Sequence, residues 1–132
     1  MSASQVAAIV ARLASGPAGT LHAYDAVPSS PVYPYVVVYA DGGVRSSDRE
    51  ADIRTSKTLT WQTTVVGTSA GQCRAALDRV TAALEDWRPV VTGYTASKVD
   101  HESAQPVRPD ESLPDRTVFI GTDQWSSVFD PT

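Results

Sequence analysis

One stretch of alternating polarity, residues 57–68, constrains the fold of this chain more than any other feature. On one side of this stretch the residues are mostly large and apolar: Leu59, Trp61, Thr63 and Val65. On the other side they are polar: Thr58, Thr60, Gln62 and Thr64. This period-two pattern predicts a β-strand with one buried face. At about 3.3 Å per residue the strand could reach roughly 40 Å, which is long for so small a chain.

A helix is predicted directly after this strand. Ser69 and Gln72 have the spacing of a capping box, in which the two side chains satisfy free backbone groups at a helix start. The residues up to Pro89 then place an apolar side chain once per turn, at Cys73, Leu77, Val80, Leu84 and Trp87. A shorter amphipathic helix is predicted from Ser4 to Ser15, and Gly16 and Pro17 would end it.

The remaining β-prone segments complete a sheet. Valine outnumbers leucine by a wide margin, which favours strands over helices. Further strands are predicted at Pro34–Tyr39, with Pro34 at the start, at Val90–His101, and as a long strand or hairpin at Thr117–Phe129; Asp41–Ser56 and Glu102–Arg116 are predicted as exposed connections. We therefore expect a single α+β domain over residues 1–132, a mostly antiparallel sheet with two helices on one face.

Composition argues against several classes of function. The formal net charge is -4 and no stripe of lysine and arginine occurs, so specific nucleic-acid binding is not expected. No long apolar segment predicts a signal peptide or a membrane span, and the lone Cys73 cannot form an internal disulfide. His22 and His101 lack the spacing of metal ligands, so we expect neither metal nor cofactor.

One pattern resembles an enzyme motif. Gly67-Thr68-Ser69-Ala70-Gly71 matches the G-x-S-x-G nucleophile elbow between a strand and a helix. With His101, a carboxylate such as Asp86 and donors at Gly42-Gly43, it would give a small serine hydrolase. That scaffold requires a parallel sheet with crossover helices, whereas the helix cap alone explains Ser69. We interpret Ser69 as a cap and expect no catalytic residue; the hydrolase is the alternative.

Three segments together resemble the tail terminator, or tail completion, family of long-tailed bacteriophages. They are the opening helix leading to Pro34–Tyr39, the strand at Lys57–Gln62 feeding the helix Ser69–Trp87, and the loop Pro106–Asp110 before Val118–Val128. The resemblance covers nearly the whole chain and rests on the order and length of the elements. A head-tail connector or neck protein of similar fold is the related alternative.

The resemblance implies a virion structural protein, made in the host cytoplasm and placed at the head-proximal end of the tail. Such a protein forms a ring, six subunits by resemblance, on the last tail tube subunits. It stops tube polymerisation and offers a docking surface to head-completion proteins. DNA would pass through the ring, and a negative net charge would favour passage because phosphates are repelled.

Two segments are candidate contacts with neighbours or partners. The charges of residues 41–57 balance and could fix the register of a neighbour, or could simply be solvated. The proline-stiffened loop 102–116 would lose little entropy on docking, or could be a surface loop without a partner. The candidate interface residues are Arg45, Asp48, Arg49, Glu50, Asp52, Arg54, Lys57, Arg108, Asp110 and, near the C-terminus, Trp125.

Overall fold

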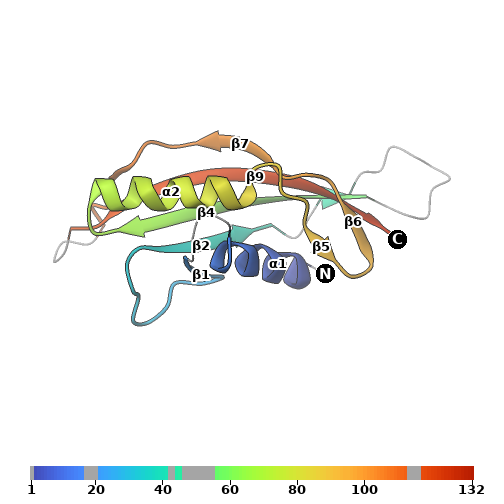
Figure 1. Cartoon of the computed structure of the whole chain (residues 1–132), viewed down its shortest axis with the longest axis horizontal. Helices are drawn as coiled ribbons and strands as arrows, with labels where there is room; N and C mark the ends of the chain where they lie inside the picture. Colours follow the sequence, from blue (N-terminus) through green and yellow to red (C-terminus); the bar gives the residue numbers. More distant parts are fainter. Residues whose placement is uncertain (1, 17–20, 42–43, 46–55, 113–116) are drawn as a thin grey trace.

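The structure is a computed structural model, which describes residues 2–16, 21–41, 44–45, 56–112 and 117–132. Two helices and nine strands occur in these ranges (Figure 1). In chain order they are α1 (Ser2–Ala14), β1 (His22–Tyr24), β2 (Tyr35–Ala40), β3 (Val44–Arg45), β4 (Lys57–Gly67), α2 (Ala70–Leu84), β5 (Val90–Val91), β6 (Tyr94–Ala96), β7 (Asp100–Ala104), β8 (Arg108–Pro109) and β9 (Phe119–Pro131).

The described strands form one sheet with β4 and β9 at its centre. The main strand order is β1-β2-β4-β9-β6-β5; β3 also pairs with β4, and β7 and β8 also pair with β9. The pairing of β1 with β2 is parallel and every other pairing is antiparallel. β4 and β9 pair without a break from Lys57 opposite Phe129 to Gly67 opposite Phe119.

Both helices pack on one face of this sheet, and the core lies between the helices and the sheet. The sheet contributes alternate residues to the core, as strand geometry requires: Val36 and Val38 of β2, Leu59, Trp61 and Val65 of β4, Trp125 and Phe129 of β9. The helices contribute Ile9 and Leu13 of α1 and Cys73, Ala76, Val80, Ala83 and Leu84 of α2. The predicted fold, an α+β domain with a mostly antiparallel sheet and two helices on one face, is confirmed.

The strongest sequence signals also gave the right elements. Both predicted helices, the strand after Pro34, the long strand at residues 57–67 and the final strand are present. α2 ends at Leu84, before the predicted end, although the ring of Trp87 still packs against the core. There the guanidinium of Arg12 lies 5.4 Å from the centre of that ring, and its Nε donates to the carbonyl of Ala83 at 2.8 Å, so that α1 is tied to α2.

Two predictions about weaker segments were wrong, and one further short strand was not predicted. The single strand predicted at Val90–His101 is a hairpin, β5 and β6, followed by the start of β7. The loop predicted at Glu102–Arg116 contains the rest of β7 and all of β8. The segment before β2 holds the short parallel strand β1. These strands have two to five residues each, too few for alternation to be recognised.

The start of α1 and the end of β9 lie toward the same end of the molecule (Figure 1). There α1 contacts β5, β5 pairs with β6, and β6 pairs with the last residues of β9. The turn from β4 to α2 lies at the opposite end. No helix in the described part of the chain has the length and apolar character needed to cross a membrane.

Candidate functional site

The serine of the elbow-like motif is a helix cap. Ser69 has extended backbone angles, φ -144° and ψ 159°, and its Oγ accepts the backbone N–H of Gln72 at 3.1 Å. The Gln72 side chain returns to Thr68, accepting its backbone N–H at 2.6 Å and its hydroxyl at 3.0 Å. The predicted capping box is therefore present, with the return bond one residue earlier than the standard pattern.

The remaining members of the supposed triad are not brought to Ser69. His101 on β7 pairs with Trp125, whereas Gly67, beside Ser69, pairs with Phe119 at the other end of β9. Six residues along a strand correspond to roughly 20 Å. The carboxylate beside His101 is Asp123, not Asp86. Gly42-Gly43 lies outside the described residues. The geometry does not assemble a hydrolase site.

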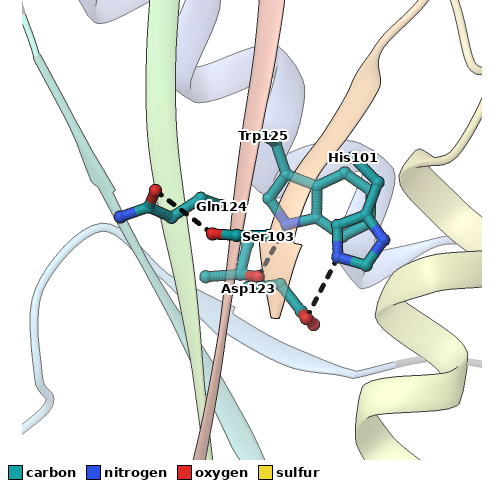
Figure 2. A network of polar contacts seen from close by, with 6 residues as sticks. His101, Ser103, Asp123, Gln124 and Trp125 are labelled. Carbon is teal, nitrogen blue, oxygen red and sulfur yellow. Dashed lines mark hydrogen bonds and ion pairs between the residues drawn. The ribbon is translucent and has the colours of Figure 1, made fainter. Parts of the chain in front are cut away.

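His101 instead belongs to a polar cluster on β7 and β9 (Figure 2). Its ring stacks on that of Trp125, with centroids 4.3 Å apart and planes 18° from parallel. Its Nε2 lies 3.1 Å from Oδ1 of Asp123, whose side chain is 7% exposed. Beneath them, Nε1 of Trp125 donates to the hydroxyl of Thr63 at 2.9 Å. The cluster thus joins an exposed strand to the buried centre of the sheet.

Burial sets the ionisation of the cluster's carboxyl group. Loss of solvent raises the pKa of Asp123, because a charged carboxylate is less stable away from water. The hydrogen bond and the charge of His101 act in the opposite direction and are the smaller effects. Among the described residues no group of three or more histidine, cysteine or acidic side chains is placed to hold a metal ion. The contacts of His101 with Asp123 and Trp125 tie β7 to β9.

Most of the predicted charged interface segment lies outside the described residues. This holds for Asp48, Arg49, Glu50, Asp52 and Arg54. The backbone of Arg45 lies in β3 and pairs with Lys57 at the first residue of β4. This segment therefore meets the sheet at the start of β4, beside Lys57.

The second predicted segment reaches the opposite end of the central strands. Arg108 lies on β8, pairs with Ile120 and is exposed. Asp110 follows it and accepts the hydroxyl of Ser112 at 2.6 Å and its backbone N–H at 3.0 Å. These two bonds lower the pKa of Asp110 and keep the carboxylate ionised. The bond from the hydroxyl has the larger effect and the bond from the backbone N–H the smaller one. An exposed arginine and a half-buried aspartate, of opposite charge, thus lie where β8 ends.

The prediction that Trp125 is an interface residue has to be corrected. Its side chain has no exposed surface, because the His101 ring covers it and β9 points it toward the helices. Its polar neighbours Gln124 and Ser126 lie on the other face of the strand, as alternation dictates. Trp125 is a core residue.

The sheet face without helices is polar and uncharged along its centre. Two hydrogen bonds join its side chains: Gln62 to the hydroxyl of Thr64, and Thr64 to Thr122 across the two strands, each 3.3 Å. The positions along this part of the face are Thr60, Gln62 and Thr64 of β4 and Thr122, Gln124 and Ser126 of β9. Such a face presents hydroxyl and amide groups to its surroundings.

Comparison with solved structures finds the same fold in a virion. A chain of the virion of a native gene transfer agent particle superimposes with a TM-score of 0.76 and is 19% identical. The match covers 98% of the present chain and 96% of that chain. At this identity the likeness establishes the fold.

Sequence comparison provides the family. No curated protein matches the chain. The family model described as tail completion protein gp17 matches residues 7–119, from α1 to the first residue of β9. The chain therefore belongs to the tail completion protein gp17 family.

Proposed function

We propose that this chain is a tail terminator, a non-enzymatic subunit of a phage-like virion. Several copies would form a ring on the head-proximal end of the tail tube, stop its growth and present a surface to head-completion proteins. The observation that carries the proposal is the family match over residues 7–119, supported by a shared fold with a gene transfer agent virion chain over nearly the whole length of both. Six subunits are proposed from family resemblance.

A structural role also agrees with the one enzyme-like motif. The hydroxyl of Ser69 is used by the helix cap, and the strand register separates it from His101 by roughly 20 Å. The two groups that a hydrolase would have to bring within hydrogen-bond distance are thus held apart by the sheet itself.

The separation of the two candidate contact segments supports a head-to-tail contact between subunits. A closed ring uses a head-to-tail contact, in which one patch of a subunit meets a different patch of its neighbour. β3 pairs with β4 at the Lys57 end of that strand. β8 pairs with β9 at Phe119, the residue that pairs with Gly67 at the other end of β4. Ten residue steps along β4 separate these ends by roughly 33 Å. We propose that residues 41–57 of one subunit meet the Arg108–Asp110 region of the next.

Deletion of the gene from the phage or prophage that encodes it tests the role directly. Electron microscopy of the resulting particles should show tails of excessive length that fail to join heads. Tails of normal length without heads would indicate a neck protein instead. Unaltered virions would exclude any structural role.

A charge reversal tests the proposed ring contact. Complementation of the deletion with Arg108→Glu should yield few joined virions, since the exposed charge at the end of β8 would be reversed. Arg79→Glu, which reverses an exposed charge on α2, is the matched control and should complement fully. Equal complementation by both variants would remove Arg108 from the interface.

A further inference from the structure

Among the described strands β7 pairs only with β9, and it is held to the sheet more weakly than the central strands β4 and β9 are held to each other. All five of its residues are exposed, so it buries little apolar surface of its own. Its pairing with β9 is interrupted by a register shift between His101 and Ser103. Segments with few buried contacts and exposed backbone hydrogen bonds open at a lower free energy than the global fold.

The strongest side-chain attachment of β7 is His101. Its ring lies flat on the fully buried Trp125, and its Nε2 reaches the nearly buried carboxylate of Asp123 (Figure 2). The other side-chain ties of the strand are exposed: Ser103 to Gln124 at 3.3 Å, and Ser126 to Glu102 at 2.6 Å. Exposed bonds of this kind exchange readily with water and contribute little.

The rest of the sheet does not depend on β7. β9 keeps its full pairing with β4 along its other edge, and α2 covers the same two strands from the helix side. Loss of β7 would therefore free the edge of β9 between Asp123 and Ser126 and uncover the indole of Trp125, while the central strands keep their partners.

We propose that β7 is a strap that opens and closes while the rest of the fold stays intact, and that His101 is its latch. The latch acts through two contacts on one side chain, the ring stack and the hydrogen bond, which no other described side chain of β7 supplies. This inference is independent of the proposed role in the tail.

Hydrogen exchange of the purified full-length protein, followed by mass spectrometry or NMR, tests the strap. Protected amides of residues 100–104 should exchange at least roughly tenfold faster than those of Trp61 and Val65 in β4. Their exchange should be nearly insensitive to low denaturant concentrations, because little surface is exposed on local opening. Identical rates and denaturant dependence for β7 and β4 would overturn the proposal.

Variants test the latch. His101→Ala should speed exchange in β7 by roughly tenfold, since a stacked ring pair and a hydrogen bond are both lost. Exchange in β4 should stay unchanged. The matched control Ser103→Ala, which removes an exposed bond of the same strand, should change β7 exchange by less than about threefold. Unchanged β7 exchange in His101→Ala would remove His101 as the latch. If His101→Ala weakens the whole fold, the wild-type rates still decide whether the strap opens.

Discussion

The two edges of β9 are built in different ways. Along one edge, β4 provides an unbroken partner for eleven residues. Along the other edge, β9 pairs with three separate segments: two residues of β8, four residues of β7 with a bulge between them, and three residues of β6. The first edge also lies under α2 and contributes Trp61 and Val65 to the core. Continuous pairing and burial thus coincide on one edge.

The difference shows how this small fold distributes stability. The β4–β9–α2 unit has the long register and the large buried side chains, so its residues should open only when the whole chain unfolds. The short strands β6, β7 and β8 at residues 94–109 all pair with β9 and carry mostly exposed side chains. Substitutions on the two edges should therefore differ in size and in kind.

The largest effect is expected from Trp61→Ala on the continuous edge. Trp61 is 1% exposed and lies between the sheet and the helices. Truncation of a buried tryptophan costs about 3–5 kcal/mol, a large part of the stability of a small domain. Urea unfolding should show this loss as a lower midpoint. A cost no greater than that of His101→Ala would break the comparison between the edges.

A smaller cost is expected from Gly121→Ala, where α2 packs on β9. A Cβ at Gly121 would lie 2.5 Å from Cδ1 of Leu77, so the helix or the leucine must move. Overpacking of this kind costs about 1–3 kcal/mol. Since Leu77→Ala makes room, the double variant should be more stable than the sum of the two single losses predicts. Strict additivity in denaturant unfolding would contradict direct contact.

Ser69→Ala should cost about 1 kcal/mol, because α2 loses its cap. Ser69→Asp should retain most of the stability, since a carboxylate can accept the same N–H. Thermal unfolding of both variants checks this. Equal melting temperatures for Ser69→Ala and the wild type would mean that the start of α2 is fixed by packing alone.

The smallest effect, with the opposite sign, is expected from Asp123→Asn. Burial raises the folded-state pKa of Asp123, so its contribution to stability is fully present below the unfolded pKa, about 3.9, and is lost as pH rises through the folded pKa. The amide carries no charge to bury and can still accept a bond from His101.

Unfolding free energies of Asp123→Asn and the wild type, measured at pH 3.5 and pH 7, check this expectation. Relative to the wild type, the variant should be more stable at pH 7 than at pH 3.5. A difference that does not change with pH would mean that the His101 contact fully offsets the burial of the carboxylate.

The sequence predicted the continuous edge and missed the segmented one for a physical reason. β4, α2 and the end of the chain carry patterns of ten or more residues, which identify their elements before any tertiary contact is known. Strands of two or three residues, such as β6 and β8, carry no readable pattern and form because β9 offers an edge.

The contacts of the candidate site also differ in whether the sequence could predict them. Ser69 was predicted as a cap because its partner Gln72 lies three residues away. The contact of His101 with Asp123 spans 22 residues and depends on the register of β7, which sequence spacing does not reveal. The burial of Trp125 could have been found, because alternation along β9 places it on the same face as Phe129.

Because the chain starts and finishes toward the same end of the molecule, fusion tags on either terminus report on one and the same surroundings (Figure 1). A particle that incorporates both tagged forms has that end open to solvent, whereas a particle that rejects both has it enclosed. To probe the far end, a tag must be inserted within the chain, and the exposed residues Ser29 and Ser30 between β1 and β2 provide a site for it.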